Sequence, residues 1–588
     1  PKPRMKLDAD MQALLRDVDM AMLNYKIRPT HITELEALPR TAETSELVSY
    51  DGEADDDLDR KSPAALFGSA RIGSVVLPVE LQNAVDRVIN SMDKSQLQSD
   101  ARRLFEEEQG NDNAWSTTYD KKYRSHVQAR RHFERDSAAF VSVALPAHYS
   151  AVFAVLDHVK KRLGSEFVVE RVLEWGSGAG SALWATYHSF QQPTSETNID
   201  LEDLRLSNST ITSYLSIERR EGLSTMAKRL VADSEGSGMI WQRTYHDDDR
   251  IPRTQAADTM AISAFHLTSV KDAASKKALI KEMWDSGAHT IVLIDHNTAE
   301  GFGSIVEARQ ALLKMGEREM EDPETAEWPI RGCHVLAPCP HDGKCPLHHP
   351  GAIKLVCGFE QRLQRPAFVR KTKGSGRGHE DIGYSYVVIR RGPRPSPATT
   401  ALGRIGQFGR RELEKDAHTM VKPRELQQHS EEEHIEARAQ PSSAEIADDL
   451  VSARLKQDTL PPAELEVALR AEAYSWPRLV FPPIKNSGHI IIDGCTNEGT
   501  KIMRMTIPRS QGKQPFYDAR KSHWGDIFPH PPKNPPQERY QPSRSKNATS
   551  SIKSAEIGKR GQEIKHKDRT SYKAISEDIK DKAYKRRK

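Results

Sequence analysis

Hydrophobic stretches long enough to cross a membrane are missing from this sequence. No run of about 18 apolar residues occurs, so we expect no transmembrane helix. Hydrophobic residues make up only 37% of the 588 residues, aromatic residues 6%, and the mean hydropathy is -0.66. So lean a composition indicates that parts of the chain are solvated arms rather than packed domains. The length allows about three to four domains.

Cysteine is also scarce. Five cysteines in 588 residues argue against a secreted disulfide scaffold. Three of the five, Cys339, Cys345 and Cys357, lie within one short segment. Such clustering in an otherwise cysteine-poor chain indicates a metal site in a reducing compartment.

Charge is nearly balanced overall but unevenly distributed. The net charge is +3, while residues 51–59 (DGEADDDLD) form an acidic block. Residues 551–588 contain 13 Lys and Arg against 6 Asp and Glu, a net charge of +7. A basic tail with little apolar content either lies along nucleic acid or is simply solvated, and composition alone favours neither.

Seven short apolar runs alternate with helical patterns from residue 167 onward. They are residues 168–175, 214–218, 239–245, 259–265, 289–295, 334–337 and 384–390. This alternation predicts an α/β domain with a largely parallel sheet. A helical region at 129–163, broken once at Pro146, precedes it. The cysteine-rich segment before the seventh run is expected to be an insertion rather than a crossover helix.

Composition divides the chain into five expected segments. They are a helical, charged region at 1–128, the α/β domain at 129–392 with a cysteine-rich insertion at 333–357, a charged linker at 393–473, a small β-rich module at 474–530 and a basic tail at 531–588. The linker contains a helix that is polar on all faces at 425–438. The β-rich module is built on a hairpin of strands 489–493 and 503–507, and the tail is expected to be disordered without a partner.

A glycine-rich turn follows the first strand, in the sequence EWGSGAGSALW at 174–184. Glycines let the backbone approach a ligand closely. Such a turn serves a dinucleotide or S-adenosylmethionine, and its short spacing resembles the first motif of class I methyltransferases. The next strand ends in a carboxylate, 38 positions after Gly180, that could accept ribose hydroxyl hydrogens. The cofactor-binding candidates are Glu174, Gly176, Ser177, Gly178, Gly180 and Glu218.

The cysteine segment has the spacing C-x5-C-x11-C and supplies three candidate metal ligands. A fourth ligand could be Cys333, the distant Cys495 or a histidine of the same loop. The histidines available are His341, His348 and His349. Four thiolates suit either Zn²⁺ or a [4Fe–4S] cluster. The alternative is a set of buried cysteines without a metal.

No known methyl-acceptor motif is found. The end of the fourth strand reads AISAFH at 261–266 and offers no carboxamide to orient an amine. The Pro338-Cys339 dipeptide matches the nucleophile of RNA cytosine-5 methyltransferases, but it follows the sixth strand instead of the fourth. The sequence therefore leaves enzymatic activity open.

Four blocks in order resemble one family, the mitochondrial small-ribosomal-subunit methyltransferase-like proteins, which have bacterial relatives. The blocks are LPAHY at 145–149, EWGSGAGSALWA at 174–185, APCPHDGKCPL at 337–347 with QRLQRP at 361–366, and a C-terminal block from WPR at 476–478 to ARKSHWGD at 519–526. The third block is the most specific of the four.

This resemblance implies a class I S-adenosylmethionine methyltransferase fold, a location in the mitochondrial matrix and a role in small-subunit assembly and translation. It implies mitochondrial small-subunit rRNA and ribosomal proteins as partners, and no DNA. It also implies a [4Fe–4S] cluster, with zinc as the alternative, that would join the C-terminal hairpin to the methyltransferase domain. The implied ligands are Cys339, Cys345, Cys357 and Cys495, which leaves Cys333 unligated.

The resemblance also places RNA contacts on the C-terminal module. Basic side chains would contact phosphates and aromatic side chains would stack on bases. The candidates are Arg504, Arg509, Lys513, Arg520 and Lys521 for phosphates, and Tyr517 and Trp524 for bases. Two alternative functions remain: an active S-adenosylmethionine-dependent rRNA methyltransferase, and a zinc-stabilised protein methyltransferase.

Overall fold

The computed structural model of this chain describes residues 60–106, 115–118, 126–192, 203–234, 238–348, 355–396, 398, 403–411, 415 and 461–539. The acidic block at 51–59, the polar helix expected at 425–438 and the basic tail at 551–588 lie outside these residues. Those three expectations therefore stay predictions.

All seven strands predicted for the α/β domain are present in one sheet. They are β2 (Arg171–Trp175), β3 (Ser213–Ile217), β4 (Met239–Gln242), β5 (Thr259–Ala264), β6 (Thr290–His296), β7 (Cys333–Ala337) and β9 (His379–Arg391). Two further strands, β1 (Ser74–Val75) and β8 (Phe359–Gln364), were not predicted. The order is β1-β8-β9-β6-β5-β2-β3-β4, with β7 also paired to β9.

The direction of the strands identifies the fold class. Strands β4, β3, β2, β5 and β6 are parallel neighbours, whereas β9 runs antiparallel to both β6 and β7. The last strand of this sheet in chain order, β9, thus runs in the opposite direction and lies between β6 and β7. This is the strand plan of class I methyltransferases, a Rossmann-like α/β fold, and it confirms the predicted fold class.

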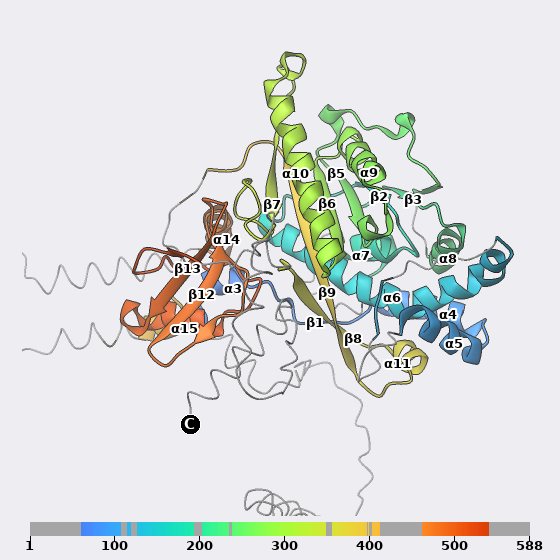
Figure 1. Cartoon of the computed structure of the whole chain (residues 1–588), viewed down its shortest axis with the longest axis horizontal. Coiled ribbons are helices and arrows are strands. Elements are labelled where there is room, and N and C mark those ends of the chain that lie inside the picture. Colours follow the sequence, from blue (N-terminus) through green and yellow to red (C-terminus); the bar gives the residue numbers. More distant parts are fainter. Residues whose placement is uncertain are drawn as a thin grey trace, which may run out of the picture. The chain divides into compact units, whose positions relative to one another are not determined.

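Helices cover both faces of this sheet (Figure 1). They include α6 (His126–Leu163), α7 (Ser181–Ser189) and α8 (Glu221–Val231) on one face, and α9 (Ala273–Asp285) and α10 (Ala299–Glu321) on the other. Successive strand residues alternate between the two faces. Val172 of β2 joins the core beneath α6 and α7, while its neighbour Leu173 joins the core beneath α9 and α10.

Helix α6 corrects one expectation, because it runs unbroken through Pro146. Proline inside a helix costs about 3 kcal/mol. The residues around it, among them Leu145 and Tyr149, are completely buried, so packing outweighs this cost. The part of this helix at His132–Leu163 has the length and composition of a membrane span, but 94% of its apolar window is buried inside the protein. It is therefore the central core helix of the domain.

Several smaller helices complete the described chain. They are α3 (Pro63–Phe67), α4 (Val79–Asn90), α5 (Lys94–Phe105), α11 (Ala367–Lys373) and α14 (Pro462–Ala473). The cysteine-rich segment after β7 contains no helix in its described part, but β8 and α11 follow it before β9 begins. The expected insertion is thus shorter than the whole interval. Helix α14 lies in the expected linker and was not predicted.

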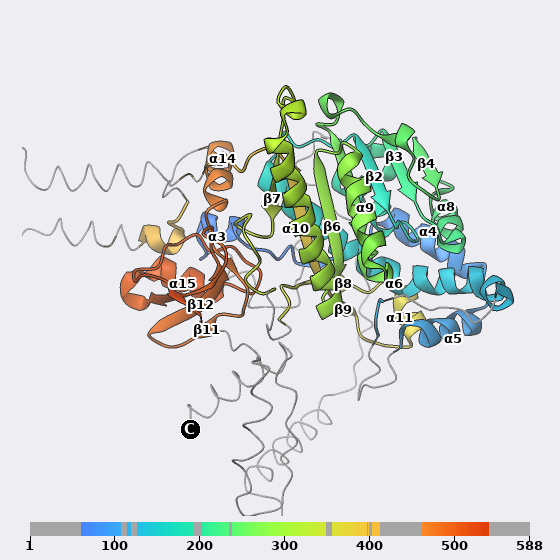
Figure 2. The same ribbon diagram turned by 45° about the horizontal axis from the view of Figure 1, so that its top comes forward.

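The C-terminal module is a second, antiparallel sheet (orange in Figure 2). Its elements are β10 (Arg478–Leu479), β11 (Ile484–Lys485), β12 (His489–Cys495), β13 (Ile502–Pro508), α15 (Lys513–Lys521) and β14 (Gln537–Glu538). The predicted hairpin is confirmed as β12 and β13. The segment before β1 also belongs here, since Ser62 Oγ donates a 2.7 Å hydrogen bond to Asp518 and Ala70 N a 2.9 Å bond to Asp526.

Candidate metal centre and cofactor site

The predicted glycine turn lies between β2 and α7, at the carboxyl edge of the sheet. Gly176, Gly178 and Gly180 all have positive φ, at 71°, 57° and 89°. Residues with a side chain rarely adopt this backbone. Ser177 Oγ accepts a 2.7 Å hydrogen bond from Ser216. The turn therefore has the shape expected of a ligand-binding turn.

Glu218 faces this turn, as predicted, but its carboxylate is already engaged by the chain. Oε2 accepts a 2.7 Å hydrogen bond from the backbone N–H of Gly178. The Arg220 guanidinium donates to both oxygens at 2.9 Å, and the Arg220 backbone N–H donates to Oε1 at 2.8 Å. Burial raises the pKa of Glu218, but the charge and hydrogen bonds of Arg220 outweigh it and hold this pKa below its usual value.

The space beside the turn is filled by rings. A Cβ built on Gly176 would lie 2.1 Å from Cγ of His266. Phe265, in the left-handed region at φ 56°, stacks on His148 with centroids 3.9 Å apart, and His296 lies 5.5 Å from His148. A ribose would have to displace both Gly178 and Arg220 from Glu218. In this conformation Glu218 is engaged within the chain and is not open to a ribose.

Glu174, the acidic residue of the motif, faces the core of the sheet. It is 1% exposed and accepts a 2.7 Å hydrogen bond from the hydroxyl of Tyr214. Burial is the main cause that raises the pKa of Glu174 to about 8; the hydrogen bond of Tyr214 opposes this rise, and the nearby charge of Glu218 adds to it. Glu174 therefore joins β2 to β3 inside the core of the sheet.

Four of the five cysteines line one cavity. Cys339 and Cys345 lie in the loop after β7, Cys357 lies two residues before β8, and Cys495 ends β12 of the C-terminal module. Apolar side chains of α10, including Phe302 and Val306, form part of the wall. Two segments far apart in the chain thus meet at this cavity, and they bring the four predicted ligands together.

The thiols at this cavity act on one another electrostatically. Burial raises the pKa of Cys345 to about 11, with a further contribution from Cys339. Burial followed by the neighbouring thiols likewise raises the pKa of Cys357 and of Cys495. Gathered thiols resist ionising without a cation, and a bound metal would stabilise them as thiolates. The donor set therefore fits a metal or an iron–sulfur cluster.

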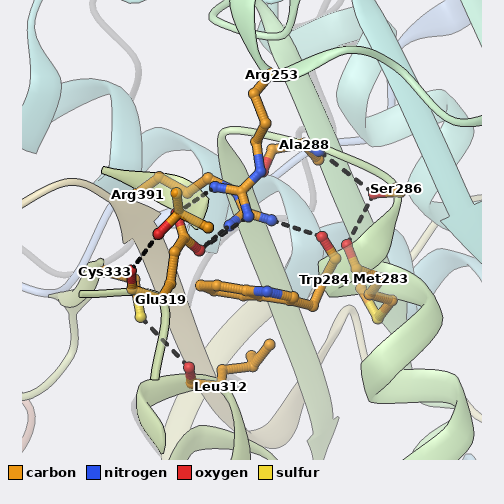
Figure 3. A network of polar contacts seen from close by, with 10 residues as sticks. Arg253, Met283, Trp284, Ser286, Ala288, Leu312, Glu319, Cys333 and Arg391 are labelled. Atoms are coloured by element: carbon orange, nitrogen blue, oxygen red, sulfur yellow. Dashed lines mark hydrogen bonds and ion pairs between the residues drawn. The ribbon is translucent and has the colours of Figure 1, made fainter. Parts of the chain in front are cut away.

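Cys333, considered as an alternative ligand, belongs to a different environment. It is absent from the residues that line the cavity, and its thiol donates to the Leu312 carbonyl at 3.5 Å. Figure 3 shows Cys333 beside a buried network of Glu319 and Arg391. Burial raises its pKa to about 12. Of the three candidate histidines, His341 lines the cavity and His348 does not, while His349 is outside the described residues.

A second group of possible ligands lies elsewhere, on α5 and α6. The ligand atoms of Asp100, His132 and Asp136 lie within 4.8 Å of one another. Arg103 forms ion pairs with both carboxylates, and Arg135 pairs with Asp100 at 2.8 Å. By the same measure, no three cysteine sulfurs among the described residues lie within 4.8 Å of one another. The carboxylates already have cationic partners, so this group is a charge network of the helices.

The residues predicted to contact RNA lie on and beside α15. Arg509, Lys513 and Arg520 are exposed, whereas Arg504 is paired with Asp493 at 2.7 Å. Lys521, Tyr517 and Trp524 are half-buried, and Tyr517 stacks on Phe408.

Further basic side chains from other segments gather near Lys485. Burial lowers the pKa of Lys485, and the charges of Lys521, Arg520, Lys61 and Arg71 lower it further, so each of these four cations acts on Lys485. We call Lys61, Arg71, Lys485, Arg520 and Lys521 the cationic surface.

Sequence reasoning missed three arginines at these sites. Arg220 follows Glu218 by two positions, and its pairing with that carboxylate depends on the local turn. Arg309 and Arg478 line the cysteine cavity. Each stands in an apolar stretch, Arg309 between Ile305 and Leu312 on α10. An arginine within an apolar stripe was the signal that could have identified it.

The strand plan and the two sites define the class: a methyltransferase-fold protein that joins a C-terminal module through a cavity of four thiols. Within this class, residues 134–529 match the family described as mitochondrial small ribosomal subunit Rsm22, and the chain belongs to this family. The predicted family and mitochondrial location are thereby confirmed.

Two curated proteins illustrate the similarity. Rsm22-cox11 tandem protein 2, mitochondrial, of Schizosaccharomyces pombe is 24% identical over 411 residues, which are 66% of this chain and 43% of that protein. The human protein named ribosome assembly protein METTL17, mitochondrial, is 21% identical over 428 residues, 72% of this chain and 70% of that protein. The chain thus spans less than half the length of the fission yeast protein.

Similar solved structures include methyltransferases. Phosphoethanolamine N-methyltransferase 2 of Haemonchus contortus, in complex with S-adenosyl-L-methionine, is 14% identical with a TM-score of 0.21, and the match covers 35% of this chain and 45% of that one.

Proposed function

We propose that this chain is an assembly factor of the mitochondrial small ribosomal subunit that acts in the matrix, binds small-subunit rRNA and ribosomal proteins, and is needed for mitochondrial translation. Family membership supports the ribosomal role. The observation that carries RNA binding is the cationic surface, where five basic side chains from three segments gather. Clustered cations that repel one another in the free protein gain most from contact with phosphates.

The cationic surface also predicts how the protein docks on the rRNA. Exposed Arg509 and Lys513 belong to the same C-terminal module as Lys485, Arg520 and Lys521. Phosphate contacts of this kind fix position and orientation and give little sequence specificity. The shape of the rRNA would then decide where the protein binds.

Co-sedimentation with mitochondrial small subunits tests this proposal. The double substitution Lys485→Glu with Arg520→Glu should reduce the bound fraction several-fold and flatten its salt dependence. The matched control is Lys277→Glu with Lys281→Glu on α9, where both lysines belong to the methyltransferase domain. Equal binding of both double variants would contradict the RNA-binding face.

We further propose that Cys339, Cys345, Cys357 and Cys495 hold a [4Fe–4S] cluster. Four thiolates on one Zn²⁺, each at about 2.3 Å, would lie only about 3.8 Å apart. No three of these sulfurs lie within 4.8 Å of one another in the described chain. A cluster needs wider spacing because each thiolate binds a different iron. When bound, the cluster would link the loop after β7 to the C-terminal module and so support the face that contacts RNA.

The proposed assembly role requires no methyl transfer. The engagement of Glu218 and the stacked rings beside the turn favour an assembly factor over an active rRNA methyltransferase. A zinc-stabilised protein methyltransferase is the other alternative, and metal analysis separates it from the cluster.

A further inference from the structure

Two buried arginines line the cysteine cavity, and neither has a carboxylate partner among the residues that the structure describes. Arg309 is 2% exposed and Arg478 is 3% exposed. Taking a guanidinium out of water is costly unless an opposite charge lies nearby. Elsewhere in the described core, Arg391 pairs with Glu319 and Arg365 with Glu380. The two cavity arginines therefore need a different counter-charge.

The contacts of Arg478 tie the two sides of the cavity together. Its Nε donates to the carbonyl of Pro338, which precedes Cys339. Its Nη1 donates to the carbonyl of Gly525, and the guanidinium lies 5.4 Å from the ring of Phe359. On the neighbouring strand Arg478 is paired in register with Cys495. The paired strands β10 and β12 thus place both a thiol and a positive charge at the cavity.

Arg309 approaches the same loop from α10. It donates to the carbonyls of His341 and Gly343, both at 2.8 Å, and its Nε has no hydrogen-bond partner within the described residues. Its guanidinium therefore holds the backbone between Cys339 and Cys345. The nearest acidic side chain of this loop, Asp342, is bound by Arg394 at 2.8 Å. Asp342 is thus already neutralised by another arginine.

A tetrathiolate centre would supply the negative counter-charge that the two arginines lack. Four thiolates around Zn²⁺ or around an oxidised [4Fe–4S] core carry a formal charge of about -2. We propose that Arg309 and Arg478 are the counter-ions of an anionic tetrathiolate centre in this cavity, and that Arg478 fastens the C-terminal module to the cysteine loop as that centre forms. This inference rests on the proposed metal centre.

Substitutions that remove charge but keep hydrogen bonding test this role. The full-length protein is purified without oxygen as wild type, Arg478→Gln, Arg478→Lys and Arg309→Gln. The matched control is Arg504→Gln, an arginine of the same module that is paired with Asp493 and does not line the cavity. Two quantities are measured: the rate of metal loss to a chelator and, for an iron–sulfur centre, its reduction potential. Circular dichroism reports whether each variant is folded.

Both glutamine variants should lose metal at least about tenfold faster than wild type, because the charge that stabilises the centre is gone. The reduction potential should become more negative, since adding an electron becomes harder without the cations. Arg478→Lys should fall between wild type and Arg478→Gln, and Arg504→Gln should match wild type.

Two outcomes would overturn the inference, and they are distinguishable. A wild-type centre that Arg309→Gln and Arg478→Gln retain with unchanged rate and potential would overturn the role of the arginines alone. A wild-type protein without a tetrathiolate centre would overturn the proposed centre and this inference together. If Arg478→Gln fails to fold, Arg309→Gln and Arg478→Lys still decide the question.

Discussion

The backbone amide of Gly178 donates a 2.7 Å hydrogen bond to Glu218, so the carboxylate that would hold the ribose of a nucleotide cofactor is bound to the glycine turn itself. Arg220 completes this arrangement with two side-chain hydrogen bonds. The fold of a methyltransferase is therefore retained while the conformation disfavours its cofactor.

The first prediction concerns cofactor affinity. Arg220→Ala should bind S-adenosylmethionine several-fold more tightly than the wild type, because one of the two groups that engage Glu218 is removed. Equilibrium dialysis with labelled S-adenosylmethionine measures this difference. Arg229→Ala is the control, since Arg229 lies on α8 and pairs with Glu134. Tight binding by the wild type, unchanged in Arg220→Ala, would show that the turn is open in solution.

The second prediction concerns the pH dependence of stability. Glu174 has a pKa of about 8 in the folded protein against 4.5 as the ordinary value. The folded state therefore keeps a proton that the unfolded chain releases, and stability falls as pH rises from about 4.5 to about 8. At about 1.4 kcal/mol per pH unit, the loss of stability is roughly 5 kcal/mol across this window.

Urea unfolding at pH 5 and pH 8 checks the role of Glu174. Glu174→Gln should lose most of this difference, because the amide cannot titrate but still accepts the hydrogen bond of Tyr214. Glu170→Gln, an exposed position beside the same strand, should keep the wild-type difference. If Glu174→Gln has the same pH dependence as the wild type, Glu174 is not protonated at neutral pH.

The third prediction concerns the buried network in Figure 3. Glu319 accepts from Arg253 at 2.7 Å and lies 3.4 Å from Arg391. Glu319→Gln would leave two guanidiniums without their counter-charge and should lower the free energy of unfolding by about 3 kcal/mol. Urea denaturation measures this change.

An exposed pair of the C-terminal module provides the comparison for Glu319. Lys501 lies 2.7 Å from Glu538, and both side chains are more than half exposed. Glu538→Gln should change stability by less than about 1 kcal/mol. A loss of similar size in both variants would mean that the buried network contributes no more than a surface ion pair.

Much of the fold could be predicted from the sequence because its signals are local. Apolar runs such as residues 289–295 alternate with helical patterns, and the glycine turn punctuates β2 and α7. Strands β1 and β8 were missed because β1 has two residues and β8 alternates buried and exposed positions without strong apolar character. Pro146 misled the reading of α6, since tertiary packing and not local preference decides there.

The site was less predictable where it depends on contacts between distant residues. The C-x5-C-x11-C spacing is visible in the chain, but the meeting of Arg478 with Pro338 joins residues 140 positions apart. No local pattern reports such an approach. The engagement of Glu218 by Arg220 was also invisible, because an acidic strand end looks the same whether it binds a ribose or an arginine.

The most direct test is the iron, sulfide and zinc content per chain of protein purified without oxygen, as wild type, Cys495→Ser and Cys333→Ser. We expect about four irons and four sulfides per chain for the wild type and Cys333→Ser. We expect the loss of both in Cys495→Ser, because that thiol is the ligand from the C-terminal module. One zinc per chain, retained in Cys495→Ser, would contradict the cluster and its joining of the two modules.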